Sequence, residues 1–446
     1  MTSSAVSWTG PRIAVVGIGA DGWDGLGRPA REAIGAAAVV FGSARQLALV
    51  PETAAGKRVT WPSPLLPALP GLLESYVGVR LCVLASGDPM FFGIGVTLAR
   101  LFGPRALQVL PQPSSASLAC ARLGWSLADT PVVSVVGRAL SAVLPELVDR
   151  GRLLVLSADE HTPGQLAELL RGHGFGASEL TVLEQLGGPA EQIGTGVAQR
   201  WQRPAGDPLN IVAISCVADA DQVRATRLPG LPDQLFGGDG QLTKREVRAL
   251  TLAALAPAPG ELLWDVGGGS GSIAIEWCRA HPGNRAVTFE RLERRRRQIA
   301  DNAAALGVGH IVVRGELFEE VGHAEIASPE AIFVGGGLTQ DGLLGTCWAQ
   351  LRPGGRLVAN AVTAESESLL LTWAAAQGGE LRKFQIYRAE PLGSSTAWRP
   401  QLPVTQWSVV KSAARSVQIS PPNRERVAGH AVGSGPSFEH DRNNGF

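Results

Sequence analysis

The sequence of 446 residues has little of what marks a disulfide framework, a metal centre or a membrane span. Its five cysteines are odd in number, far apart and without a Cys-x-x-Cys pair, which excludes a disulfide framework and a sulfur-rich metal site. Its seven histidines form neither a His-x-x-x-His pair nor a His-Glu-x-x-His motif, so we expect no bound metal. No apolar run approaches the roughly 18–20 residues of a membrane helix, and no basic flank marks a signal peptide. We therefore expect a soluble, cytoplasmic protein without a membrane contact.

The chain has a net charge of zero, because 40 Lys and Arg residues balance 40 Asp and Glu residues. No global field therefore attracts nucleic acid or an anionic membrane. The run Arg294–Arg297 is the one strongly basic segment, and on a helix it spreads around the whole circumference with Glu290 and Glu293 as neighbours. We interpret it as a solvated helix face and expect no nucleic-acid partner.

What the sequence does have is a long alternation of short β-branched runs with helical stretches, which is typical of an α/β fold. A polar segment at 217–229 indicates a linker between two domains, at 11–216 and 230–412, and the polar residues 413–446 predict a disordered tail. The expected strands are 13–16, 39–41, 81–85, 132–136, 153–156 and 210–215 in the first domain, and 262–266, 286–289, 311–313, 331–334 and 356–359 in the second.

The plainest motif lies in the second domain, where strand 262–266 carries Asp265 and runs into Gly267-x-Gly269-x-Gly271 and a helix. Such a turn lets the backbone approach a ligand, and a carboxylate at the end of the next strand, Glu290, can accept a ribose diol. Two cofactors fit. A dinucleotide site requires Gly or Ala at the position where this chain has Ser272. The carboxylate of Asp265 before the glycines instead suits the cationic S-adenosylmethionine, which is the cofactor we favour. A glycine turn without a ligand is the third interpretation.

Other segments of the second domain add to this site. Glu316 and Leu317 follow the third strand, where methyltransferases usually contact adenine, and Gly335–Gly337 follow the fourth, where the substrate usually meets the methyl group. Upstream, the glycine loop 237–240 leads into a helix for which Thr243 is the expected N-cap, with Glu246 completing a capping box. Thr243 either serves only as that cap or also closes over the cofactor.

The first domain begins with Gly17-x-Gly19-x-x-Gly22 after a strand, a pattern that suggests a dinucleotide site. We reject that interpretation, because no helix opens at the third glycine and no acid ends the second strand. Two further polar turns follow strand ends, at 86–89 and 113–115, and ligands of α/β folds bind at such ends. These turns contain no nucleophile–base pair, which argues against hydrolysis.

Taken together, the motifs resemble a known family on both sides of the linker. Val16-Gly-Ile-Gly, Ser86-Gly-Asp-Pro and Pro113-Ser-Ser resemble the tetrapyrrole (corrin/porphyrin) C-methyltransferases, and residues 181–189 resemble their branch that acts at C5. Residues 242–248, 265–272, 359–363 and 403–407 resemble the decarboxylating C15-methyltransferases. Over about residues 11–411 the chain is identified as a member of the fused, decarboxylating precorrin C5,15-methyltransferases of aerobic cobalamin biosynthesis.

The resemblance implies an N-terminal tetrapyrrole-methylase-like α/β domain of two subdomains, followed by a Rossmann-like class I methyltransferase domain. It implies methylation of precorrin-6B at C5 and C15 with loss of CO₂ from the ring-C acetate, one S-adenosylmethionine site in each domain, and a homo-oligomer formed through the C-terminal domain. Two alternatives stay open: a two-domain methyltransferase acting on RNA, and a non-catalytic first domain that only docks the tetrapyrrole. The residues expected to bind cofactor are Gly17, Gly19, Ser86, Gly87, Asp88, Ser114 and Ser115 in the first domain, and Thr243, Asp265, Gly267, Gly268, Gly269, Ser270, Gly271, Glu290, Glu316 and Leu317 in the second.

The chain departs from the family pattern at two positions. Val136 stands where the C5 branch usually has the histidine of a His-Gly-Arg triplet, and Gly268 stands where the C15 branch often has cysteine. No catalytic residue is assigned. Arg138, Arg245 and Arg248 are the candidates for binding substrate carboxylates, because guanidinium forks match carboxylates.

Overall fold

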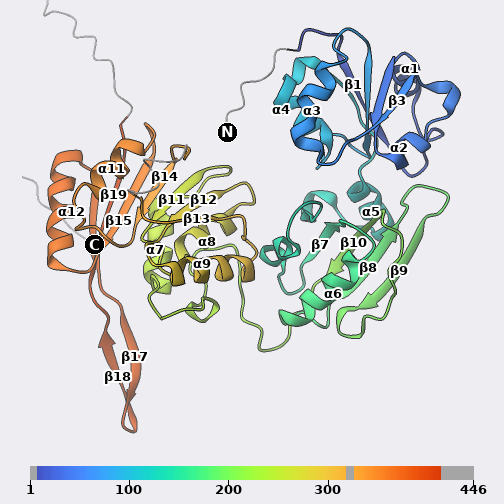
Figure 1. Ribbon diagram of the computed structural model, residues 1–446. Coiled ribbons are helices and arrows are strands. Elements are labelled where there is room, and N and C mark those ends of the chain that lie inside the picture. The colour runs from blue at the N-terminus through green and yellow to red at the C-terminus, as the bar shows by residue number, and fades with distance from the viewer. Residues whose placement is uncertain (1–7, 318–325, 413–446) are drawn as a thin grey trace, which may run out of the picture. The chain divides into compact units, whose positions relative to one another are not determined.

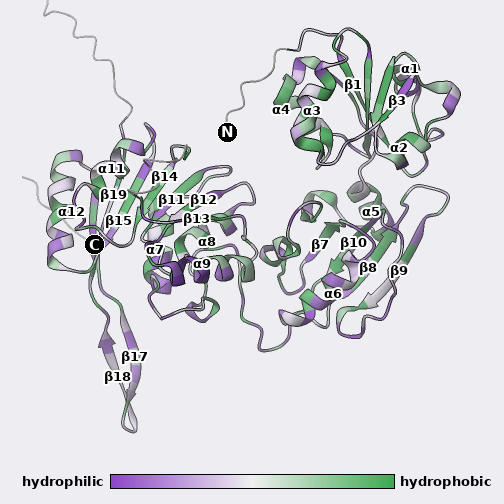
Figure 2. Ribbon diagram, in the orientation of Figure 1, coloured by the Kyte–Doolittle hydropathy of each residue, from purple (hydrophilic) through white to green (hydrophobic). Residues whose placement is uncertain are grey.

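The computed structural model describes residues 8–317 and 326–412, which form three β-sheets with flanking helices and one separate two-stranded ribbon (Figure 1). The expected tail, 413–446, lies outside the described residues. Figure 2 shows the physical basis of this layout, since the central strands of the sheets are hydrophobic and the helix α9 is strongly hydrophilic. Short 3₁₀ helices are η1 (Glu52–Ala54), η2 (Pro104–Ala106), η3 (Leu127–Asp129), η4 (Leu140–Glu146), η5 (Ala198–Arg200) and η6 (Asp233–Leu235).

The first sheet is entirely parallel and is buried on both faces. All six residues of the strand Ile13–Ile18 are buried, and they alternate between two core clusters: Ile13 and Val15 pack into one, Val16 and Ile18 into the other. In order across the sheet the strands are β3 (Lys57–Thr60), β2 (Val39–Gly42), β4 (Leu81–Ser86), β1 (Ile13–Ile18) and β5 (Leu107–Leu110). The helices between them are α1 (Arg28–Gly35), α2 (Ala44–Ala48), α3 (Leu65–Glu74) and α4 (Ile94–Phe102).

The second sheet is mostly antiparallel, with one parallel pair at its edge. Its strands are, in order, β6 (Val132–Ser134), β7 (Arg152–Leu156), β10 (Asn210–Ser215), β8 (Glu179–Glu184) and β9 (Gln192–Val197), accompanied by α5 (Ser115–Leu123) and α6 (Thr162–Gly172). The presence of two sheets in residues 13–215 agrees with the expected pair of subdomains. The segment 217–229 contains neither helix nor strand, and the carbonyl of Ala225 accepts a hydrogen bond of 2.7 Å from Arg279.

The third sheet has seven strands, of which the first five are parallel and the last two antiparallel to their neighbours. In order they are β13 (Val312–Arg314), β12 (Arg285–Phe289), β11 (Leu262–Val266), β14 (Ala331–Val334), β15 (Arg356–Ala361), β19 (Val404–Val410) and β16 (Glu380–Phe384). Residues of α7 (Arg245–Leu255), α8 (Ser272–Ala280) and α9 (Glu293–Ala305) join one core cluster, and residues of α11 (Leu343–Gln350) and α12 (Ala364–Gln377) join another. The strand order reverses between β11 and β14, where such sheets bind ligands.

The ribbon consists of β17 (Tyr387–Leu392) and β18 (Ser395–Pro400), and it is inserted between β16 and β19. Figure 1 shows it extending away from the third sheet.

All eleven expected strands are present, with ends that differ by at most two residues, so the α/β fold class is confirmed. The strands that sequence patterning missed are β3, β5, β8, β9 and β16–β19. Several of them alternate little or are exposed: all five residues of β16 are exposed or half-buried, so its composition carries no strand signal.

Candidate functional site

The glycine turn after β11 is required by the close approach of two loops. Gly267, Gly269 and Gly271 all have positive φ, of 77°, 59° and 77°. A Cβ at Gly267 would lie 2.8 Å from the backbone nitrogen of Gly336. The turns after β11 and β14 therefore meet backbone to backbone, as expected for a ligand cradle at a switch point.

Gly268 is needed for a different reason. A Cβ at this position would lie 2.1 Å from Cγ2 of Thr288 and 3.2 Å from Cδ1 of Ile299. The cysteine that the family often carries here has no room in this chain. Glycine instead of cysteine at position 268 is thus coupled to Thr288 on the neighbouring strand β12. The substitution is therefore not neutral, even if only the backbone of residue 268 contacts the cofactor.

Glu290 follows β12, and its carboxylate is held in one orientation. Its Oε2 accepts a hydrogen bond from the Gly269 N–H and its Oε1 accepts one from the Leu292 N–H, both at 3.0 Å. The side chain is buried yet lines the cavity described below. A carboxylate fixed next to a glycine turn has the geometry to accept the two hydroxyls of a ribose, and this contact of Glu290 stays a prediction.

Asp265 lies within β11, is 1% exposed, and has an Oδ2 atom without a hydrogen-bond partner among the described residues. Burial raises the pKa of this carboxyl to about 7, and the negative charge of Glu290 adds to the effect, against a hydrogen bond from the Ala274 backbone that opposes it. A buried, unpaired acceptor of this kind lacks a partner that a cationic ligand would supply.

The glycine turn and Glu290 border a cavity of about 900 Å³, a size within the roughly 300–1,000 Å³ typical of small-molecule sites. Of the sequence-predicted site residues, those that line it are Thr243, Gly267, Gly268, Gly269, Glu290, Glu316 and Leu317. Gly335–Gly337 line it as well, and Glu316 accepts a hydrogen bond of 2.6 Å from Gln340. Asp265, Ser270 and Gly271 are not among the residues that form its wall.

The expected capping role of Thr243 is wrong. Helix α7 starts at Arg245 with Lys244 as its N-cap, and no side chain caps it. The Thr243 carbonyl instead accepts a hydrogen bond from Arg248, and Glu246 pairs with Arg388 of the ribbon at 2.7 Å. Thr243 is therefore held by its backbone, which leaves its side chain at the cavity.

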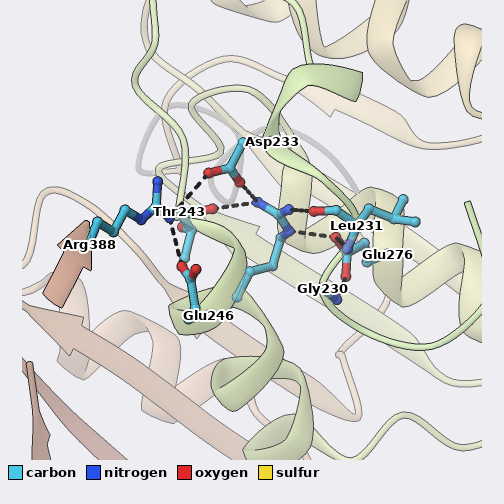
Figure 3. A network of polar contacts seen from close by, with 8 residues as sticks. Gly230, Leu231, Asp233, Thr243, Glu246, Glu276 and Arg388 are labelled. Atoms are coloured by element: carbon cyan, nitrogen blue, oxygen red, sulfur yellow. Dashed lines mark hydrogen bonds and ion pairs between the residues drawn. The ribbon is translucent and has the colours of Figure 1, made fainter. Parts of the chain in front are cut away.

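The expected role of Arg248 in binding substrate is also wrong, because its side chain is completely buried. Figure 3 shows the network around it: the guanidinium contacts the carboxylates of Glu276 and Asp233 and the carbonyls of Leu231 and Thr243. Glu276 also accepts hydrogen bonds from the backbone N–H groups of Gly230 and Leu231, at 2.6 and 2.9 Å. Arg248 thus ties the segment that leads into α7 to the helix α8.

Arg245 is exposed and is not part of the cavity wall. The basic residues that do line the cavity are Lys244, Arg291, Arg295 and Arg388. Sequence reasoning missed all four as ligand contacts. Lys244 and Arg291 each follow a predicted site residue in the sequence, so their proximity to the site could have been predicted. No neighbouring motif indicates that Arg388 belongs to the site.

The arginines of α9 form ion pairs, as expected for a solvated helix. Glu293 pairs with Arg296 and Arg297, while Arg294 and Arg295 pair with Asp239. Glu290 does not take part through its carboxylate, contrary to the expectation, because that group is engaged by backbone N–H groups. This side-chain pairing leaves little free charge for phosphates.

In the first domain the three polar turns meet at the carboxyl ends of β1, β4 and β5. A Cβ at Gly17 would lie 2.0 Å from the carbonyl oxygen of Gly87 and 2.7 Å from the nitrogen of Gln112. Ser114 caps α5 by accepting a hydrogen bond of 3.1 Å from the Ser117 N–H, and Ser115 is the first residue of that helix. The expected residues are therefore brought together, although Gly22 opens no helix, as argued from the sequence.

The remaining expected residues of the first domain have local partners. The Ser86 hydroxyl accepts hydrogen bonds from Arg45 and Gln46, and Asp88 accepts one from the Met90 N–H. Arg138 is exposed, and its guanidinium lies 5.8 Å from the ring centroid of Phe92. Arg138 thus remains accessible to a ligand, and Val136 beside it is 60% exposed.

Within residues 8–317 and 326–412, no group of three His, Cys, Asp or Glu side chains has the arrangement of a metal site. Nor does that part of the chain contain a helix with the length and apolarity required to cross a membrane.

Comparison with known proteins covers both parts of the chain. The family profile described as "Tetrapyrrole (Corrin/Porphyrin) Methylases" matches residues 12–200, and that described as "Precorrin methyltransferase domain" matches residues 234–411. A Mycobacterium tuberculosis protein named "Precorrin-6Y C(5,15)-methyltransferase [decarboxylating]" is 52% identical over 407 residues, which are 90% of this chain and 100% of the relative.

Two shorter relatives from Salmonella typhimurium each match about two fifths of this chain. One is named "Cobalt-precorrin-7 C(5)-methyltransferase" and is 31% identical, covering 41% of this chain and 88% of the relative. The other is named "Cobalt-precorrin-6B C(15)-methyltransferase (decarboxylating)" and is 30% identical, covering 39% of this chain and 92% of the relative. With a full-length relative above half identity and both domain profiles matched, this chain belongs to the family of decarboxylating precorrin-6Y C(5,15)-methyltransferases.

Proposed function

We propose that this protein methylates precorrin-6B at C5 and C15 and releases CO₂ from the ring-C acetate, which gives precorrin-8. Family membership supports the overall reaction, and precorrin methyltransferases are in general dependent on S-adenosylmethionine. The observation that carries the proposal is the cavity of about 900 Å³ between the turns after β11 and β14, with its fixed carboxylate Glu290.

We further propose a division of labour between domains 11–216 and 230–412, each with its own cofactor site. The first domain would methylate C5, and the second would methylate C15 and decarboxylate. Support comes from the two Salmonella relatives, each of which carries one of the two activities in its name. The three polar turns of the first domain and the glycine turn of the second provide a separate cradle in each.

The residues of the second domain fit S-adenosylmethionine. When bound, this cofactor supplies an electrophilic methyl group on a cationic sulfonium. Glu290 would accept the ribose hydroxyls, and the negative charge of the buried Asp265, which does not form the cavity wall, would act on the bound cation through space. Glu316 and Leu317 would hold the adenine, since both line the same cavity.

The wall of the cavity is suited to alignment more than to acid–base chemistry. Its carboxylates are engaged, Glu246 by Arg388 and Glu290 by backbone N–H groups, and its remaining surface includes the apolar side chains of Leu242, Phe333 and Leu343. Methyl transfer to an electron-rich carbon of a macrocycle needs orientation and exclusion of water, which such a wall provides.

The test is incubation of the full chain with precorrin-6B and methyl-labelled cofactor, with product mass as the readout. We expect two added methyl groups and loss of CO₂. Asp265→Asn should slow C15 methylation by roughly 10–150-fold, because a unit charge a few ångströms from a bound cation contributes about 1.5–3 kcal/mol in a partly screened site, and C5 methylation should persist. Asp301→Asn, an exposed change on α9, is the matched control.

Cofactor stoichiometry tests the division of labour. Calorimetry on the full chain should give about two bound cofactors, and Asp265→Asn should weaken one of the two. A wild-type stoichiometry of one, or equal loss of both methylations in Asp265→Asn, would contradict separate sites.

We also propose that the protein works in the cytoplasm as a homo-oligomer that contacts through its C-terminal domain. The five cysteines are free and buried, which fits a reducing compartment. The ribbon exposes apolar side chains such as Trp398, which is 73% exposed. Light scattering on the full chain, compared with Trp398→Ser, tests this assembly.

A further inference from the structure

We infer that Lys244, Arg291 and Arg388 form a carboxylate-binding rim around the cavity of the second domain, and that Arg388 binds a substrate carboxylate with the donors that its internal partner Glu246 leaves unused. This inference rests on the proposed function, since it names the groups that position the substrate in the C15 site. It replaces the earlier candidates Arg245 and Arg248.

The three basic side chains converge from separate parts of the domain. Lys244 is the N-cap residue of α7, Arg291 lies in the turn between β12 and α9, and Arg388 is the second residue of β17 in the ribbon. All three line the same cavity. A cavity that collects cations from three elements matches an anionic ligand better than any one of them would alone.

Lys244 and Arg291 carry charges that the described part of the chain leaves uncompensated. No hydrogen bond or ion pair of the Lys244 ammonium or the Arg291 guanidinium occurs among residues 8–317 and 326–412. Arg295, by contrast, is held by Asp239 and Gln241 at 2.9 and 2.6 Å, and so is already committed. The free cations are thus the ones next to the glycine turn and at the start of α7.

Arg388 is only partly paired. Its Nη2 lies 2.7 Å from Oε2 of Glu246 and 3.7 Å from Oδ2 of Asp233. Figure 3 marks both contacts with dashed lines. Both contacts use the same nitrogen, so Nε and Nη1 have no ion-pair partner among the described residues. An arginine fork has five N–H donors, and the unused ones can take a second carboxylate bidentately. The side chain is 36% exposed, whereas Arg248 is fully buried and saturated with partners.

Next to this rim the cavity has an apolar surface. Val362 and Leu402 line it and are 55% and 72% exposed, and Ile386 lies two residues before Arg388 on the same wall. Large exposed apolar side chains beside free cations suit a ligand with a flat apolar body and carboxylates at its edge. The rim and this apolar surface together fit an apolar polycarboxylate, the chemical class to which the macrocycle of the proposed function belongs.

The decisive experiment compares Arg388→Ala with Glu246→Gln in the full chain. If Arg388 binds substrate, Arg388→Ala should raise KM for precorrin-6B in C15 methylation by about tenfold or more with a smaller change in kcat, because charge-assisted hydrogen bonds are lost. Glu246→Gln removes the competing acid and one negative charge, so KM should stay the same or fall. Arg388→Lys should recover part of the affinity. A similar rise in KM in Arg388→Ala and in Glu246→Gln would overturn the inference, because that result would mean that the ion pair only supports the ribbon.

Two further measurements separate this inference from the proposed function. Uroporphyrin III, a stable fluorescent polycarboxylate, should bind wild type more tightly than its methyl ester, and Lys244→Gln, Arg291→Gln and Arg388→Ala should each reduce that preference. Arg399→Ala, which lies opposite Arg388 in the ribbon and pairs with Glu390 away from the cavity, should change neither KM nor porphyrin binding. If wild type fails to methylate precorrin-6B, the proposed function fails, while porphyrin binding still tests the rim. If methylation proceeds and the three variants bind porphyrin like wild type, the rim is wrong.

Discussion

Arg248→Met is the sharpest test of how the second domain holds its ligand-binding segment together. The Arg248 side chain is 0% exposed and its partner Glu276 only 3%, so the ion pair is shielded from solvent. The change removes the guanidinium but keeps an unbranched apolar chain of similar length. Glu276 then keeps its two hydrogen bonds from Gly230 and Leu231 and the attraction of Arg279, three residues along α8, as partial compensation for its buried charge.

The expected loss of stability follows from the charge that is left behind. Breaking a buried ion pair by removing one partner costs about 3–5 kcal/mol, because the remaining buried charge loses its direct partner. The carbonyl of Leu231 also loses its donor, but this contribution overlaps with the first and is not added. With a urea slope of about 2 kcal/mol per molar, the midpoint of the transition should fall by roughly 2 M.

The assay is urea unfolding of the full chain, followed by tryptophan fluorescence and without cofactor. Arg399→Met, an exposed arginine of the ribbon, controls for loss of a positive charge. The double variant Arg248→Met/Glu276→Met should recover part of the loss, because apolar side chains can replace a buried pair, although Gly230 and Leu231 then lose their acceptor. An unchanged urea midpoint together with a raised KM for the substrate would refute the reasoning. That result would indicate that Arg248 binds the substrate after all.

Two other predictions concern the glycine turn. Burial raises the pKa of Asp265 to about 7 in the folded chain. The folded chain therefore keeps a proton that the unfolded chain releases above about pH 4. This proton contributes stability at low pH, and the contribution is lost as the pH rises towards 7. Urea titrations between pH 4 and 8 should show that loss in wild type and not in Asp265→Asn; identical slopes would contradict the shift. Gly268→Cys should lower stability by about 1–3 kcal/mol, since its Cβ would lie 2.1 Å from Thr288 Cγ2, and Thr288→Ser should restore part of it. Thermal melts of the single and double variants check this, and a Gly268→Cys variant as stable as wild type would refute the coupling.

Some of this molecule could be predicted from the sequence because the signals are local. The strand 262–266, the glycine turn and Glu290 lie within thirty residues, and each is specified by short-range chemistry: apolar runs, positive φ and a carboxylate at a strand end. The same holds for the apolar strands of the first sheet. Their predicted positions agree with the structure to within two residues.

The exposed and edge strands were not predictable in this way. The ribbon strands and β16 are held by pairing with partners and not by their own patterning, and Arg388 reaches Glu246 across 142 positions of sequence. No local pattern encodes such a contact.

The sequence alone therefore determined the fold class, the family resemblance and the residues of the glycine turn, because periodicity and motif spacing are properties of neighbouring residues. Only the tertiary structure decided which arginines face the ligand. Arg248 has the same charge as Arg388 and lies closer in the sequence to the predicted site residues. It is nevertheless fully buried against Glu276, while Arg388 lines the cavity. The physical reason is that a charge's role depends on which partners and how much solvent surround it, and these are fixed only when distant segments pack together.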